Sequence, residues 1–338
     1  MKPAIRTIAA VGVAASLVFA ATACSSPSST PAASGTAEAK KLTIAFVMGA
    51  EADPFFKAMK VGAEAAAKAQ NVTLIWQGDP SVYSPATQIP FVDQVLAQKP
   101  DGLVLIPTDP IALQASVTKA VAAGVVVANV DTHVGDLSKV LTFITGDNIQ
   151  GGEAAADTMA KAIGYKAGGS YQVVAGLTSA TATTNVDRLK GFEAQLAKKY
   201  PEIKLVDKAF SQSQAATANS NVSNWLTKYP TLNGIFAIDG TNATGAASAL
   251  QAKGLTGKVA LIGYDAYQAN VDLIGKGVFT ALVAQNPAEE AKQAIEAIVK
   301  YIKAGNNKDG IEASVVLPNI VLDKSTSPDD LKKFTYVQ

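Results

Sequence analysis

Acidic, amide and guanidinium side chains stand at related places along this chain of 338 residues. Each follows a short apolar segment or opens the helical stretch after one, and each can exchange hydrogen bonds with hydroxyl groups. Carboxylates accept such bonds, arginine donates several, and glutamine does both. Four carboxylates around one arginine favour a neutral or cationic, hydroxyl-rich ligand over an anionic one. These candidate binding residues are Asp53, Asp131, Arg188, Asp239, Asp265 and Gln285.

The segments that precede these residues must position them. They are short, apolar and rich in β-branched residues, which is typical of strands buried on both faces of a parallel sheet. Helical stretches separate them, and the chain is too long for one ordinary core, so we predict an α/β fold of two doubly wound parallel-sheet lobes. Ligands bind beyond the carboxyl ends of such strands, although any single aspartate there could simply cap a helix. The predicted strands are 42–48, 72–77, 103–107, 125–130, 140–145, 171–176, 203–210, 234–239, 258–265 and 278–285.

The N-terminus has the pattern of an export signal. Lys2 and Arg6 precede an apolar run over 8–23 that is short for a transmembrane helix, although a membrane anchor helix is the alternative. The stretch before Cys24 resembles a bacterial lipobox, with Ala21 where leucine is usual. We therefore predict a lipoprotein signal peptide over 1–23, lipidation of Cys24, and a protein anchored to the outer face of the bacterial cell membrane.

Residues 24–40 are rich in Ser, Pro, Ala and Thr, and this composition predicts a flexible tether. The formal net charge of the whole chain is +1 and no basic cluster is present, which argues against a nucleic-acid partner. Cys24 and His133 are the single cysteine and histidine, so neither a disulfide within the chain nor a Cys/His zinc site can form. We expect no metal and no cofactor.

The sequence offers little support for an enzyme. It has no G-x-G-x-x-G motif for a dinucleotide after a strand and no G-x-S-x-G nucleophile elbow. His133 is more simply a rim residue than part of a triad. A glycosidase that uses paired carboxylates such as Asp53 and Asp239 stays open as an alternative. A transcription factor on this fold would carry a DNA-binding motif where the export signal stands.

Eight stretches together resemble the periplasmic-binding-protein type I family, close to its ribose-binding and related sugar-binding members. They occur in family order and span almost all of the chain after the tether. The stretches are ADPFFKAMKVGAEAAAK (52–68), LVLIPTDP (103–110), VANVDT (127–132), ITGDNIQGG (144–152), DRLKGF (187–192), IFAIDGTNATGA (235–246), LIGYDA (261–266) and ALVAQNP (281–287).

This resemblance implies roles for individual residues. Phe55 and Phe56 would stack on a sugar ring, although both could instead be core residues. Thr132 stands where the family often has arginine, and Asp239 stands where it usually has asparagine, so the ligand need not be ribose. An aromatic is also common near 210–213, where Phe210 or Gln212 could stand. The implied ligand-binding set is Asp53, Phe55, Phe56, Asp131, Thr132, Arg188, Asp239, Asp265 and Gln285.

The resemblance also implies three crossings between the lobes, near Gly146, Gln285 and Leu317. The N-terminal lobe would comprise 41–146 and 286–316, and the C-terminal lobe 147–285 and 317–338. The implied function is that of a monomeric solute-binding component of an ABC importer. It would close on a small sugar, polyol or cyclitol and deliver it to the permease transmembrane subunits. A receptor of the same fold that feeds a signalling protein is the alternative.

Overall fold

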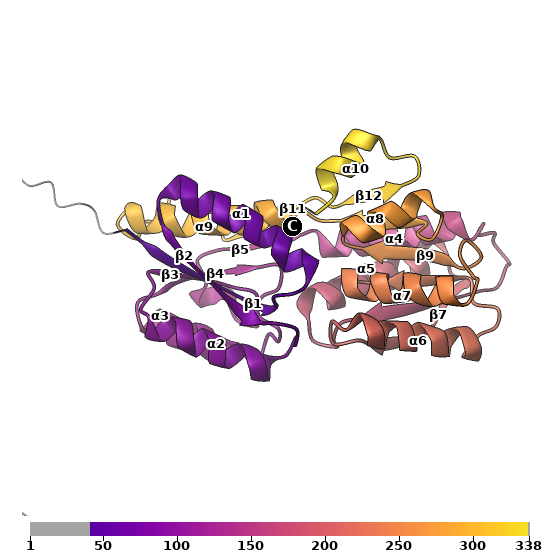
Figure 1. Cartoon of the computed structure of the whole chain (residues 1–338), viewed down its shortest axis with the longest axis horizontal. Helices are drawn as coiled ribbons and strands as arrows, with labels where there is room; N and C mark the ends of the chain where they lie inside the picture. The colour runs from indigo at the N-terminus through magenta and orange to yellow at the C-terminus, as the bar shows by residue number, and fades with distance from the viewer. Residues whose placement is uncertain (1–40, 337–338) are drawn as a thin grey trace, which may run out of the picture. The chain divides into compact units, whose positions relative to one another are not determined.

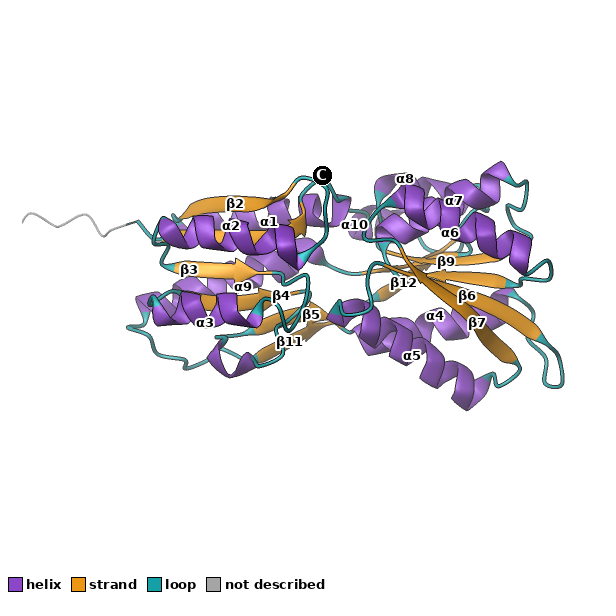
Figure 2. Cartoon of the chain, turned by 90° about the horizontal axis from the view of Figure 1, so that it is seen from below, coloured by secondary structure: helices purple, strands orange, loops and turns teal. Residues whose placement is uncertain are grey.

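The computed structural model describes residues 41–336, and the predictions for the signal peptide, Cys24 and the tether over 24–40 lie outside them. Two six-stranded sheets organise these residues, each with helices on both faces (Figures 1 and 2). The two sheets have the same strand order once the strands are numbered within each lobe. The predicted fold class is therefore confirmed.

We call the first sheet and its helices the first lobe. Its strand order is β11-β5-β4-β3-β1-β2, and all its neighbouring strands are parallel. Its elements are β1 Thr43–Ala50, α1 Pro54–Gln70, β2 Thr73–Asp79, α2 Pro85–Ala97, β3 Gly102–Leu105, α3 Gln114–Ala122, β4 Val126–Val130, η1 Leu137–Lys139, β5 Phe143–Gly146, α9 Pro287–Lys303 and β11 Ser314–Leu317.

The second sheet and its helices form the second lobe. Its strand order is β12-β10-β9-β8-β6-β7, and β12 pairs antiparallel to β10 at the edge. Its elements are α4 Asn148–Ala162, β6 Tyr171–Leu177, α5 Thr183–Lys199, β7 Ile203–Phe210, α6 Ala215–Lys228, β8 Gly234–Ala237, α7 Gly240–Ala252, β9 Ala260–Tyr264, α8 Gln268–Gly275, β10 Ala281–Ala284, β12 Ile320–Asp323 and α10 Pro328–Phe334.

Strand β1 shows why these sequences fold as central strands. Ile44, Phe46 and Met48 are fully buried on one face, and Ala45 and Val47 are fully buried on the other. Helices α1 and α9 pack against each other, and helix α2 contacts both β1 and β2. A strand covered on both faces reads as a continuous apolar run, which is the pattern that predicted it.

Two strands and a helix near the C-terminus were not among the predicted elements. Strands β11 and β12 are four residues each, and the side chains of β11 alternate between exposed and half-buried. Such short edge strands lack the apolar run of a central strand. The second sheet is parallel, as predicted, except at its edge strand β12. The short link after β11 leads directly into this strand without an intervening helix, so β12 runs antiparallel to β10.

Parallel register brings the ends of neighbouring strands together. Ala237 at the end of β8 pairs with Gly176 of β6 and with Gly263 of β9. Residues that follow these strands therefore lie side by side at one edge of the sheet. Among residues 41–336, no helix is both long and apolar enough to cross a membrane.

Candidate ligand-binding site

A cavity lies at the carboxyl ends of the strands and is lined by residues of both lobes. Eight of the nine predicted binding residues line it, and Thr132 does not. The lining residues that were predicted are Asp53, Phe55, Phe56, Asp131, Arg188, Asp239, Asp265 and Gln285.

Arg188 of α5 is held rigidly although it is 2% exposed. Its Nε donates to Asn148 Oδ1 at 2.8 Å, its Nη1 donates to the carbonyl of Ile238 at 3.0 Å, and its guanidinium lies 3.7 Å from the centre of the Tyr264 ring. Its Nη2 stands 4.0 Å from Asp131 Oδ1 and makes no hydrogen bond with the described residues. One end of the guanidinium is thus fixed, and the other faces the carboxylate of the opposite lobe.

The carboxylates of the second lobe are held by several hydrogen bonds. Asp239 accepts bonds from Thr241 Oγ1 and the Asn242 backbone N–H on one oxygen, and from Thr178 Oγ1 and Asn242 Nδ2 on the other. Asp265 accepts from the Gly240 N–H at 2.9 Å, and its other oxygen accepts from the side chains of Gln285 and Tyr336. Burial raises the pKa of Asp265, while Arg188 and these hydrogen bonds oppose that shift.

The carboxylates of the first lobe have fewer partners. Asp53 caps α1 by accepting from the Phe55 N–H at 3.0 Å, and the same oxygen accepts from the Tyr267 hydroxyl. Asp131 accepts no hydrogen bond through Oδ1 from the described residues. Removal from water raises the pKa of Asp53 to about 7, and it raises the pKa of Asp131 to about 7 against the attraction of Arg188.

Three buried polar atoms at this cavity have no hydrogen-bond partner among residues 41–336. They are Asp131 Oδ1, Arg188 Nη2 and Gln285 Oε1, two acceptors and one donor. Buried polar atoms are normally hydrogen-bonded, so those that converge on a cavity without a hydrogen bond point to a partner held inside it. The set matches a ligand that both donates and accepts, which a hydroxyl group does.

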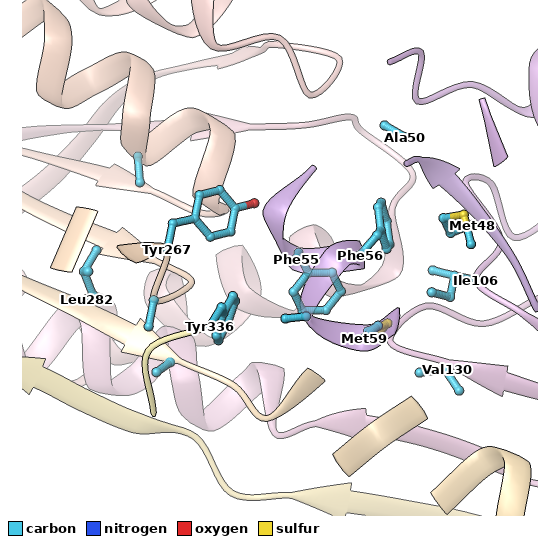
Figure 3. Close-up of a cluster of buried hydrophobic side chains, with 14 of the residues drawn as sticks. Met48, Ala50, Phe55, Phe56, Met59, Ile106, Val130, Tyr267, Leu282 and Tyr336 are labelled. Carbon is cyan, nitrogen blue, oxygen red and sulfur yellow. The ribbon is translucent and has the colours of Figure 1, made fainter. Parts of the chain in front are cut away.

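Aromatic rings line the cavity from both lobes. The rings of Phe55 and Phe56 meet edge to face with centroids 5.5 Å apart, and the Phe55 ring lies 6.1 Å from that of Tyr336. Figure 3 shows the two phenylalanines on α1 facing Tyr267 and Tyr336 of the second lobe. Phe55 and Phe56 therefore serve as core residues and as cavity wall together.

Thr132 follows Asp131 but has a structural role. It is 1% exposed, and its hydroxyl donates to the carbonyl of Pro107 at 2.7 Å. His133 is also outside this cavity: its ring meets Phe143 edge to face, and its backbone N–H donates to Thr183 Oγ1 of the second lobe at 3.3 Å. The backbone turns sharply after Asp131, so adjacent residues of this loop point to different places.

The sequence reasoning missed seven of the lining residues. Thr178 directly follows β6, so the rule that selected the other strand ends could have found it. Ser213 lies in the loop where Phe210 or Gln212 was expected, while Phe210 is 39% exposed. The others come from loops or from α5 and carry no such signal. The missed residues are Tyr83, Thr178, Ala182, Thr184, Asn185, Ser213 and Tyr267.

No group of three or more His, Cys, Asp or Glu side chains within 41–336 is arranged to hold a metal ion. Of the four cavity aspartates, Asp53, Asp239 and Asp265 instead accept hydrogen bonds from protein groups. The arrangement can bind a polar, uncharged molecule, and its aromatic walls can contact the C–H faces of a ring.

Comparisons with known proteins agree with this geometry. Residues 44–307 match the family described as "Periplasmic binding protein domain", and the chain belongs to that family. Membership implies a location outside the cytoplasm.

The D-ribose/D-allose-binding protein of Pseudomonas aeruginosa is 30% identical over 282 residues, which cover 80% of this chain and 86% of that protein. The xylitol-binding protein of Mycolicibacterium smegmatis is 25% identical, over 82% of this chain and 80% of that protein. An ABC transporter solute-binding protein from Agrobacterium vitis, solved with α-D-tagatopyranose, has a TM-score of 0.82 and 30% identity, and the match covers 88% of this chain and all of that one.

Proposed function

We propose that this protein is the solute-binding component of an ABC importer and that it takes a small neutral sugar, polyol or cyclitol into the cavity between its lobes. The observation that carries the proposal is the convergence of unpaired buried polar atoms from both lobes on that cavity. Asp131 comes from the first lobe, while Arg188 and Gln285 come from the second. A ligand that bonds to all three stabilises the closed arrangement, which is hinge closure.

The chemistry of the cavity favours hydroxyl groups over charged ones. A ligand hydroxyl can donate to Asp131 Oδ1 or Gln285 Oε1 and accept from Arg188 Nη2, so one molecule with several hydroxyls satisfies every unpaired atom. An anion would meet four aspartates and a single arginine. The Phe55 and Phe56 rings offer the apolar surface that a sugar ring covers. The named ligands of the relatives, ribose, allose, xylitol and tagatopyranose, are all of this class.

The remaining parts of the proposal concern the cell surface. We propose that residues 1–23 direct export, that Cys24 carries the lipid, and that residues 24–40 tether a monomer to the outer face of the membrane. The partners would be the transmembrane subunits of the permease. We propose no enzymatic activity: both oxygens of Asp239 are occupied by hydrogen bonds, which argues against this residue as the acid or base of a glycosidase.

A thermal-shift screen of the protein against monosaccharides, polyols, cyclitols and amino acids tests the ligand class. A ligand at about 1,000 times its dissociation constant adds roughly 4 kcal/mol to the free energy of unfolding, which shifts the melting temperature by several degrees. Arg188→Ala should abolish the shift, whereas Lys190→Ala, an exposed residue on the same helix, should preserve it. A well-folded protein that responds to no sugar, polyol or cyclitol would refute the proposed ligand class.

A further inference from the structure

Tyr267 reaches from the second lobe to the first across the cavity. It lies two residues after Asp265, is 5% exposed, and lines the cavity. Its hydroxyl donates to Asp53 Oδ1 at the start of α1, and Figure 3 shows the ring directed toward that helix. The same Oδ1 also accepts from the Phe55 N–H. One oxygen of Asp53, a predicted ligand-binding residue, therefore accepts a hydrogen bond from each lobe.

The second lobe holds the Tyr267 ring in place by its own contacts. A Cβ atom at Gly240 would stand 2.0 Å from Tyr267 Cζ, so the ring packs where only glycine leaves room. The Tyr336 ring lies 6.0 Å away on another side, and the backbones of Tyr267 and Tyr336 form a β-bridge. Gly240, Tyr267 and Tyr336 all belong to the second lobe. The hydroxyl is thus presented to the first lobe without help from it.

Two other hydrogen bonds between the lobes are longer or lie at an exposed position. The His133 N–H meets Thr183 Oγ1 at 3.3 Å, and Gln214 Nε2 donates to the Ser81 carbonyl at an exposed rim. The Tyr267 bond has a carboxylate acceptor and lies inside the cavity, and hydrogen bonds to charged or buried acceptors are the stronger ones.

We propose that Tyr267 is a positioning residue for closure: the second lobe holds it ready, and its bond to Asp53 stabilises the closed state before any ligand binds. Two consequences follow. The protein populates the closed state without ligand, and Tyr267 affects the affinity for every ligand by a similar factor, whatever its hydroxyl pattern. The second consequence rests on the proposed function, whereas the first does not.

The first consequence is tested by distances between spin labels in the ligand-free full chain. Cys24→Ser removes the single cysteine, and exposed Gln94→Cys on α2 and Ser220→Cys on α6 place one label on each lobe. We expect a closed population in the parent protein, and a roughly tenfold lower ratio of closed to open in Tyr267→Phe, which keeps the ring and removes the bond. Tyr229→Phe is the matched control, because it removes a tyrosine–aspartate bond to Asp207 within the second lobe.

A double-mutant cycle identifies the partner. Asp53→Asn keeps an N-cap residue at α1, and its effect on closure should largely vanish in the Tyr267→Phe background. A parent protein with no closed population, or a distance distribution unchanged by Tyr267→Phe, overturns the proposal.

The second consequence is tested by ligand binding. Tyr267→Phe should raise the dissociation constants of different sugars by one common factor of roughly ten. Failure of all sugars to bind would refute the proposed function while leaving the distance test intact.

Discussion

Asp131 and Asp265 occupy equivalent places in the two lobes but have very different surroundings. Each follows the fourth strand of its lobe, each donates its backbone N–H to the next strand at 2.8 Å, and each has a positive φ, 61° and 66°. Aspartate tolerates this left-handed conformation better than most residues. Yet Asp265 accepts three hydrogen bonds, whereas Asp131 Oδ1 accepts none from the described residues.

This difference separates two kinds of cavity wall. The second lobe fixes its carboxylates by its own hydrogen bonds, so the geometry of its wall does not depend on a ligand for support. The first lobe leaves Asp131 dependent on whatever enters the cavity and on Arg188, whose Nη2 lies 4.0 Å away. The wall whose carboxylates are already hydrogen-bonded holds the shape of the binding site. The wall whose carboxylate lacks hydrogen bonds gains them only from a ligand, so closure depends on the ligand. Four predictions test this contrast.

The largest effect should follow the loss of Arg188, because it is the positive charge that both aspartates share. Arg188→Ala removes bonds to Asn148 and Ile238 and leaves buried carboxylates without their counter-charge. We expect about 3–5 kcal/mol lower free energy of unfolding in urea and no detectable ligand binding by calorimetry. Arg188→Lys keeps the charge and should recover part of the stability. Normal stability in the alanine variant would contradict the shared role.

Replacing each aspartate by asparagine compares the two walls directly. Asp265→Asn turns an amide donor toward the donors of Gly240, Gln285 or Tyr336, so we expect a loss of roughly 2 kcal/mol in the ligand-free protein. Asp131→Asn breaks no hydrogen bond at Oδ1, so its cost in urea unfolding should stay within about 1 kcal/mol. Both variants should bind ligand more weakly. Equal loss of stability would remove the distinction between the walls.

Some residues of the site could be predicted from the sequence and others could not, and the reason lies in the local structure around each of them. Asp131 and Asp265 were predictable because a strand buried on both faces ends visibly at the first charged residue. Tyr267, which lines the cavity from a loop, was not predictable, and neither was Tyr336, which donates to Asp265 from the segment after α10. Their contacts depend on how distant elements meet. The antiparallel β12 was missed because four residues at a sheet edge carry little pattern. Thr132 was misplaced because proximity to Asp131 in sequence says little about direction in a tight turn.

The ligand-free protein should lose stability as pH rises toward 8. The pKa values of Asp53 and Asp131 are raised from about 4 in the unfolded chain to about 7 when folded, so their contribution is complete below pH 4 and is lost as pH rises through 7. The melting temperature should therefore fall by a few degrees between pH 6 and pH 8. Surface aspartates such as Asp157, whose pKa is lowered, change the stability of the protein only at more acidic pH.

Asp131→Asn provides the test of that assignment, since it removes one of the two groups, Asp53 and Asp131, to which the pH dependence is assigned. Its melting temperature should depend less steeply on pH than that of the parent protein. Buried Glu290 also faces this region: its two carboxyl oxygens have no partner among the described residues, burial raises its pKa well above normal, and Asp131, Arg188 and Asp265 act on it. Glu290→Gln is the companion variant. A pH profile unaffected by Asp131→Asn would place the titration elsewhere.

The smallest effect should come from Thr132, the residue after Asp131, whose counterpart after Asp265 is the fully buried Ala266. Thr132→Val removes the bond to the Pro107 carbonyl and should cost about 1 kcal/mol in urea unfolding. Thr132→Ser keeps the hydroxyl and should retain that bond. Because neither change reaches the cavity, the order of preference among sugars should be the same for both variants and the parent. An altered preference among sugars in Thr132→Val would mean that the first lobe uses this position for ligand recognition. The second lobe cannot do so with a side-chain hydrogen bond, because its residue at the equivalent position is alanine.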